Sequence, residues 1–188
     1  FQGSINYSEA TGNPQNVNDS PSNPPRAIVS SNDPSTTLNN SDYLVIKSTI
    51  VGTNETSQRW TYITGGAQPH AWNSNDLSSG DRVTVIWPRS VTAFNKELVM
   101  DGTNFFTTYS PSAFPVEYSP TAATTRFVIY GVDPDTNLRM PFNRADYYIE
   151  RPASIPQACA PNTGILYKAT INQGNGALNP DPLIDCVA

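Results

Sequence analysis

The chain has 188 residues, enough for one domain with a core of useful size. Its 17 prolines exclude a helix bundle, because each proline inside a helix removes a backbone hydrogen bond. A net charge of −5 and only 11 scattered Lys and Arg argue against nucleic-acid binding, which needs a basic surface. With 37% hydrophobic and 14% charged residues, the composition is typical of a β-dominated domain with many turns and long loops.

The first forty residues are mostly polar. Residues 1–4 (FQGS) resemble the remnant of a cleaved affinity tag. Residues 5–40 hold few large apolar side chains among Asn, Ser, Pro and Thr, so we expect a polar, partly disordered arm. Residues 27–29 predict one short edge strand within it. The β-rich domain is expected to span residues 41–188.

Strand patterns recur from residue 42 onward, where β-branched and aromatic residues alternate between turn residues. The clearest predicted strands cover residues 43–51, 59–63, 81–87, 126–132 and 164–171. Weaker patterns predict a hairpin of 97–100 with 105–109, short strands at 138–142 and 146–149, a loop at 172–182 and the start of a strand at 183–187. Together they predict a mainly β fold, as one twisted antiparallel sheet or a pair of packed sheets.

The sequence offers little for catalysis. His70 is the only histidine, and its turn-rich segment contains no nucleophile elbow, which argues against a Ser–His–Asp triad. The acidic residues Asp133, Asp135, Asp146 and Glu150 lie at predicted turns and strand ends, where we expect them to be solvated. We therefore expect no enzymatic activity and no cofactor.

Calcium is the most plausible metal. Asp133, Asp135 and Asn137 alternate as the first ligands of an EF-hand loop do. However, Leu138 replaces the required glycine, and Arg144 stands where the bidentate acid belongs. An ordinary turn is the simpler interpretation, and these three residues remain candidate ligands only.

Three tryptophans and nine tyrosines raise the question of carbohydrate binding. Trp60 and Trp87 lie within strand patterns, where aromatic residues usually pack into a core or pair across strands. Trp72 lies in a predicted loop and is the candidate ligand-binding aromatic. A glycan- or surface-binding adhesive module is therefore the alternative function.

The two cysteines, Cys159 and Cys186, cannot form a zinc site with a single histidine. Two reduced thiols remain one interpretation. A disulfide is favoured, because the domain is rich in loops and both cysteines lie in the C-terminal segment. Such a crosslink would stabilise the fold by about 3–4 kcal/mol and would indicate an oxidising compartment.

Several segments resemble PilW-type minor pilins of type IV pili. The specific ones are residues 140–149 (MPFNRADYYI), 159–169 (CAPNTGILYKA) and 183–188 (LIDCVA), and residues 41–47 and 59–62 fit the same layout. The resemblance covers residues 41–188. It implies a pilin-type head of antiparallel sheets with long loops, in which the two cysteines pair. In segment 140–149 we expect Asn143 and Asp146 to cap turns.

The resemblance also implies a biological setting. Minor pilins are structural and assembly proteins that join other minor pilins and the major pilin in a priming or tip complex. An N-terminal hydrophobic helix anchors them in the inner membrane before they enter the extracellular pilus. This helix is missing from the sequence, and the resemblance implies that the native protein has it. The J-type pseudopilin of type II secretion is a related alternative.

Overall fold

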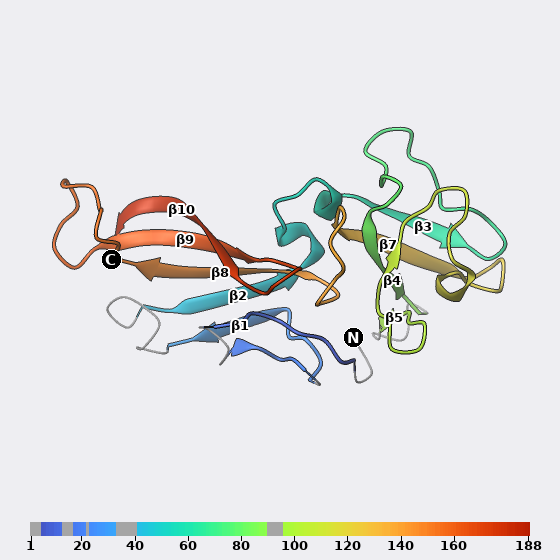
Figure 1. The fold of residues 1–188 in the computed structure, drawn as a ribbon, viewed down its shortest axis with the longest axis horizontal. Helices are drawn as coiled ribbons and strands as arrows, with labels where there is room; N and C mark the ends of the chain where they lie inside the picture. Colours follow the sequence, from blue (N-terminus) through green and yellow to red (C-terminus); the bar gives the residue numbers. More distant parts are fainter. Residues whose placement is uncertain (1–4, 13–16, 22, 33–40, 90–95) are drawn as a thin grey trace.

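The computed structural model describes residues 5–12, 17–21, 23–32, 41–89 and 96–188. Within these ranges the protein consists of β-strands in two antiparallel sheets and three 3₁₀ helices of one turn each, which confirms the mainly β fold (Figure 1). In the described part of the chain, none of the helices has the length and apolar character needed to cross a bilayer.

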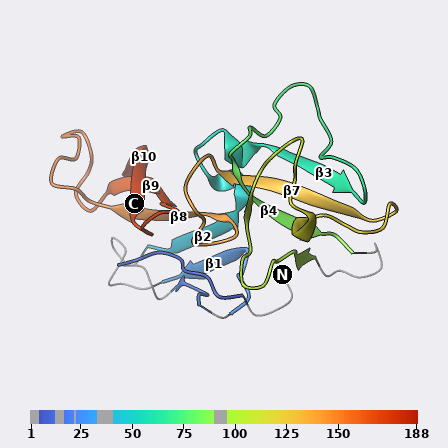
Figure 2. The ribbon, with the colours of Figure 1, turned by 45° about the vertical axis from the view of Figure 1, so that its right-hand side comes forward.

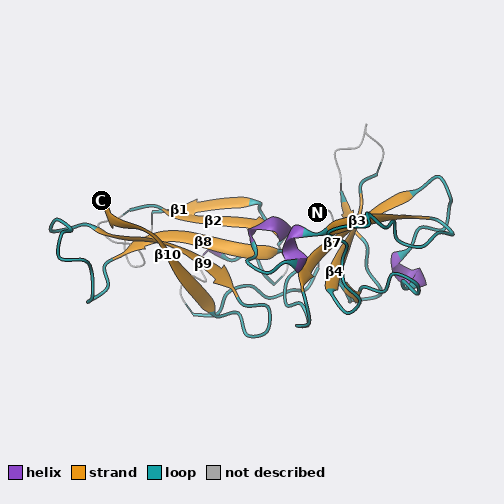
Figure 3. Cartoon of the chain, turned by 90° about the horizontal axis from the view of Figure 1, so that it is seen from above, coloured by secondary structure: helices purple, strands orange, loops and turns teal. Residues whose placement is uncertain are grey.

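Each sheet has five strands in its described part. The first sheet (sheet A) has the spatial order β1 (Ile28–Ser31), β2 (Tyr43–Ser48), β8 (Asn143–Glu150), β9 (Gly164–Ile171) and β10 (Leu178–Val187). The second sheet (sheet B) has the order β3 (Trp60–Thr64), β7 (Arg126–Asp133), β4 (Arg82–Trp87) and β5 (Glu97–Leu98), and β6 (Thr107–Thr108) pairs with β4. The sheets lie one beyond the other along the long axis, and η3 (Thr49–Val51) and η4 (Thr56–Gln58) connect them (Figure 3). The third helix is η5 (Val116–Tyr118).

The main hydrophobic core is shared by both sheets and by the N-terminal arm. Sheet B and its loops contribute Ile86, Leu98, Phe105 and Val132, sheet A and the segment before it contribute Met140, Phe142 and Ile171, and the arm contributes Ile5, Tyr7 and Ala10. A second core lies on one face of sheet B, with Val85 and Ile129 at its centre. Because one cluster draws on all three parts, the two sheets share an interior, and sheet B has its second core in addition.

The arm was expected to bury little, and in its described residues this expectation is wrong. Ile5, Tyr7 and Val17 are buried, and the arm runs beside β1 and β2 (Figure 2). The predicted edge strand forms as β1, paired with β2. The arm therefore belongs to the folded body. Residues 1–4, 13–16, 22 and 33–40 lie outside the described part of the chain.

Four strand predictions need correction. The predicted strand 43–51 ends at Ser48, since Thr49–Val51 form η3. The segments at 97–98 and 107–108 do not form a hairpin ladder with each other, because both pair with β4 along the same side. Only the turn between them forms as predicted, with two backbone hydrogen bonds between Asp101 and Asn104 and with Gly102 at φ 58°. Residues 138–142 form no strand, and residues 139–142 are bends. The last strand begins at Leu178 instead of 183. The two prolines at 180 and 182 suggested a loop, but an edge strand tolerates proline, because one side of it has no neighbouring strand to bond.

Candidate functional site

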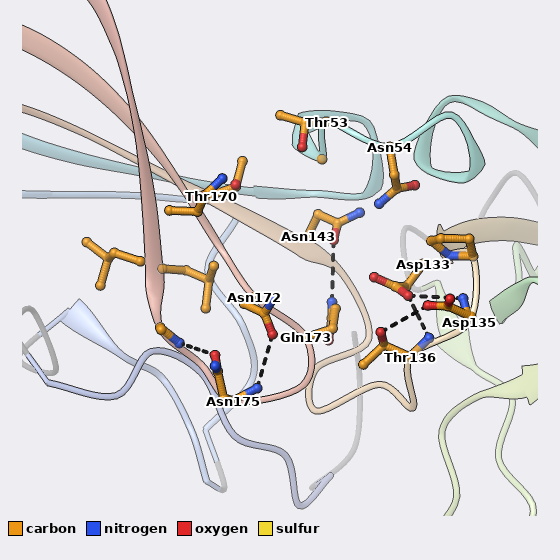
Figure 4. Close-up of a pocket in the computed structure, with 16 residues that line it drawn as sticks. Thr53, Asn54, Asp133, Asp135, Thr136, Asn143, Thr170, Asn172, Gln173 and Asn175 are labelled. Carbon is orange, nitrogen blue, oxygen red and sulfur yellow. Dashed lines mark hydrogen bonds between the residues drawn. The ribbon is translucent and has the colours of Figure 1, made fainter.

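A polar hollow of about 380 Å³ lies between the β7–β8 turn and the β9–β10 hairpin (Figure 4). Its polar lining residues are Thr53, Asn54, Asp133, Asp135, Thr136, Asn143, Thr170, Asn172, Gln173, Asn175 and Asn179. Because its described lining contains amides, hydroxyls and carboxylates but neither Lys nor Arg, the hollow does not suit an anionic ligand.

Two of the lining residues, Asn143 and Gln173, have buried side-chain amides. The Asn143 Nδ2 group donates to the carbonyl oxygens of Thr49 and Val132, both at 3.0 Å. The Gln173 Nε2 group donates to the carbonyl of Phe142 at 2.8 Å, and its Oε1 accepts from two backbone N–H groups. Asn143 was expected to cap a turn. It instead starts β8 and joins it to β7 and η3, so its role is to hold the sheets together.

The candidate calcium ligands do not converge. The Oδ1 atom of Asp133 accepts from the backbone N–H groups of Asp135 and Thr136, at 3.2 and 2.7 Å, which is an Asx-type turn. Asp133 and Asp135 line the hollow, whereas the Oδ1 atom of Asn137 accepts from Nε of Arg82. No group of three or more His, Cys, Asp or Glu side chains suited to a metal occurs among the described residues.

A network of buried charges joins the arm to sheet A. The Lys47 ammonium lies 2.8 Å from Oε2 of Glu9 and 2.6 Å from Oδ2 of Asp19. The Arg144 guanidinium contacts the same Glu9 oxygen at 2.9 Å and binds both oxygens of Asp146 at 2.7 Å. Three carboxylates thus face two cations in the interior. The exposed Arg26 pairs with Asp19 and supplies the third positive charge.

Asp146 was expected to be solvated and to cap a turn, and both expectations are wrong. It is fully buried within β8, a central strand of sheet A, because Arg144 two residues earlier compensates its charge. The Tyr43 hydroxyl also donates to Asp146 at 2.7 Å. Burial and the neighbouring Asp146 raise the pKa of Tyr43, so Tyr43 stays a neutral donor.

The network also perturbs Asp19. Burial by itself raises the pKa of this carboxyl, but hydrogen bonds from Lys47 and Arg26 outweigh that effect and hold the pKa below its ordinary value. The pKa of Arg144 is raised in a similar way, since its bonds to Asp146 outweigh the effect of burial. These side chains fix the arm to the sheet, which assigns them a scaffolding role.

An aromatic patch, defined by Trp60, Tyr62, His70 and Trp72, covers the free edge of sheet B. The His70 backbone N–H donates to the carbonyl of Tyr62, and the Trp72 Nε1–H donates to the carbonyl of Trp60, both at 2.9 Å. Tyr62 and His70 stack with ring centroids 4.6 Å apart, and Trp72 lies edge-on to His70 at the same distance. The loop after β3 therefore donates hydrogen bonds to backbone carbonyls of β3 that would otherwise lack a partner at the edge of the sheet.

The tryptophans differ from expectation in one respect. Trp87 packs against the sheet B core as expected, and Trp72 lies in a loop. Trp60 was expected to be packed but is 47% exposed, and Trp72 is 39% exposed. Alternation along a strand identifies residues that share a face, but it does not show whether other elements cover that face. Trp60 is thus a candidate residue that sequence reasoning missed.

The predicted disulfide between Cys159 and Cys186 is confirmed, with an S–S distance of 2.07 Å. It ties the loop between β8 and β9 to the end of β10. Beyond β10 no further strand of sheet A is described, so this ten-residue strand forms an edge with most of its residues exposed. Leu183 and Ile184 are 50% and 57% exposed.

No family model, curated protein or solved structure matches the chain.

Proposed function

We propose that the chain is a structural and assembly subunit of a type IV pilus, whose β-rich head binds other pilin subunits. The proposal starts from the segments that resemble minor pilins. They correspond to β8, to the loop and strand β9 that follow, and to the end of β10, which are three neighbouring strands of sheet A. These three specific segments thus lie in one contiguous part of the fold.

The observation that carries the proposal is the open edge at β10. Two adjacent residues with large apolar side chains, Leu183 and Ile184, are about half exposed on this edge. Exposed apolar groups on an edge strand are a liability for a protein that works alone, since they favour association. In a subunit that works within an assembly, the same groups are a contact surface.

The prolines of β10 limit how a partner can bind. Pro180 and Pro182 pair with Ala169 and Tyr167 of β9 and lie two residues apart, so they share an orientation. Prolines in an edge strand are tolerated where the missing N–H would face away from the neighbouring strand. A partner strand therefore cannot form a continuous ladder over this half of the edge. We infer that the partner packs on side chains near Leu183 and Ile184.

The disulfide supports the proposed setting. A crosslink of this kind persists in an oxidising environment, such as the bacterial periplasm or the cell surface. In the proposed function the head lies outside the cytoplasm, is anchored by an N-terminal helix before assembly and then enters the extracellular pilus. The proposed role is not catalytic. His70, the only histidine, stacks on Tyr62 and helps to cover the edge of β3.

Binding between this head and the soluble domains of pilin subunits from the same organism tests the proposal, measured by titration calorimetry. We expect saturable one-to-one binding to at least one minor pilin. The double variant Leu183→Asp/Ile184→Asp should weaken it by about tenfold or more, because it places charges in an apolar contact. The control is Val116→Asp, which changes a side chain that is 74% exposed on η5 and should bind normally.

Two results would contradict the proposal. One is the absence of binding to every pilin subunit tested. The other is binding that the β10 double variant and the control weaken equally. Binding to pseudopilins of a type II secretion system, and not to pilins, would move the assignment to that related machinery.

A further inference from the structure

We propose that the aromatic patch on the edge of sheet B binds neutral carbohydrate, with a pyranose ring stacked on the exposed indole of Trp60 beside the indole of Trp72, which lies at 61° to it. This inference is independent of the pilin proposal, because it concerns the other sheet and a different kind of ligand. It rests on the exposure of the two indoles, on the contacts that hold the rings of Trp72 and Tyr62 in place and on the neutral polar groups beside them.

The exposure of the two indoles is the first observation. Their ring centroids lie 5.2 Å apart, yet both side chains keep a large part of their surface in water. Two neighbouring exposed indoles form a contiguous apolar surface, and such surfaces commonly mark binding sites. By contrast, the third tryptophan, Trp87, is partly buried against the core of sheet B.

The hydrogen bonds that cover the edge of β3 do not explain why residue 60 is a tryptophan. The cover over the β3 edge uses the backbone carbonyl of Trp60, the Nε1–H of Trp72 and the backbone N–H of His70. The Trp60 indole takes no part in these hydrogen bonds. The hydrogen bonds that cover the edge therefore do not require an indole at position 60, whose ring contacts only that of Trp72 among the aromatic pairs of the described residues.

The rings of Trp72 and Tyr62, which lie beside Trp60, are held in place by several contacts. The backbone N–H of Trp72 donates to Oδ1 of Asp76 at 2.7 Å, and its indole N–H is bound to the carbonyl of Trp60. Tyr62 has His70 stacked on its ring at 4.6 Å and the Arg126 guanidinium 4.2 Å from its centroid. These two groups cannot share one face at such distances, so Tyr62 is held between them. A ring surface fixed in this way loses little conformational entropy when a ligand binds.

The groups around the two indoles favour a neutral sugar as the ligand. The face of an aromatic ring carries the negative part of its quadrupole, which suits the weakly positive C–H groups on one side of a pyranose. Beyond Trp72 lie Asn73, Ser74 and Asn75, which are exposed and uncharged. Asn73 and Asn75 have φ of 67° and 58°, a left-handed conformation that asparagine tolerates and that curves this loop tightly. Their amides and the hydroxyl can bond to sugar hydroxyls, whereas the net charge of −5 disfavours acidic polysaccharides.

The test titrates the folded chain with cellohexaose, chitohexaose and mannohexaose, and follows tryptophan fluorescence and heat of binding. We expect at least one of these neutral oligosaccharides to bind and to change the fluorescence. Trp60→Ala should weaken that binding by about tenfold or more and leave the thermal midpoint nearly unchanged. Ile28→Ala, at an exposed side chain on β1 of sheet A, is the matched control and should bind as the unaltered chain does.

Three outcomes would overturn the inference. The first is that none of the oligosaccharides binds the unaltered chain. The second is that one binds but Trp60→Ala binds it equally well. The third is that a proline-rich peptide, the other common occupant of exposed aromatic surfaces, binds at the patch and the sugars do not.

Discussion

At Lys47 a single ammonium group is shared between the carboxylates of Glu9 and Asp19, and all three side chains are buried. Ionised groups in the interior lose their hydration, so each one depends on its partner. This dependence makes the network a sensitive point of the fold. It also means that the arm is attached by charge pairing as well as by its few apolar residues.

Replacing Lys47 with Met should lower the free energy of unfolding by about 3–5 kcal/mol, because two buried carboxylates lose their shared cation. The measurement is urea unfolding at neutral pH. The matched control is Glu55→Gln, which removes a charge from the surface pair with Arg59, where the Glu55 side chain is 87% exposed. That change should cost less than about 1 kcal/mol. Equal effects of the two substitutions would contradict the assigned role of Lys47.

The lowered pKa of Asp19 predicts a dependence of stability on pH. A carboxyl whose pKa is lower in the folded state takes up protons first in the unfolded state, so stability is lost as the pH falls below about 4. Asp19→Asn should reduce stability at pH 7 and flatten its decline between neutral and acidic pH. Urea unfolding at pH 7, 4 and 3 compares the two proteins. Parallel declines for both would show that Asp19 does not contribute.

At the scale of elements, strands with continuous β-branched patterns could be predicted from the sequence. These patterns predict the segments of β2, β3, β4, β7 and β9. The disulfide is predicted on other grounds, namely the loop-rich domain, the position of both cysteines in the C-terminal segment and the resemblance to minor pilins. Only the second half of strand β10 could be predicted. Prolines 180 and 182 indicate a loop in the sequence, and only the structure shows that this strand lies at an edge of the sheet, where proline is tolerated.

Two further features could not be predicted, for physical reasons. Glu9, Arg144 and Asp146 look like surface residues in the sequence, since their burial depends on partners far away in the chain. The aromatic patch depends on how a loop folds back along β3, and periodicity says nothing about that path. Of the two exposed indoles in the aromatic patch, only Trp72 could therefore be predicted from the sequence.

The disulfide joins two elements, the loop between β8 and β9 and the end of β10, across a sequence separation of 27 residues. Replacing both Cys159 and Cys186 with Ser should lower the free energy of unfolding by about 3–4 kcal/mol, as the unfolded chain regains loop entropy. Chemical unfolding of the variant and of the oxidised protein measures the difference. A change below about 1 kcal/mol would mean that the crosslink does not stabilise this part of sheet A.

At the scale of the molecule, the shared core predicts that both sheets unfold together. Tyr7 from the arm packs edge-on against Phe142, and Tyr7→Ala should cost about 3–5 kcal/mol. All three tryptophans lie in or beside sheet B, so their fluorescence reports on that sheet, while far-UV circular dichroism reports on both. The two signals should shift equally in the variant. A fluorescence transition that stays unchanged while dichroism shifts would show that the sheets unfold independently.

The most direct test of the proposed assembly role is hydrogen–deuterium exchange of the head alone and mixed with pilin subunits of the same organism. We expect slower exchange in residues 178–187 when the partner is present, because β10 becomes covered, and unchanged exchange in residues 60–76. Protection confined to β1 or to sheet B, with β10 exchanging as in the free protein, would contradict the proposed role.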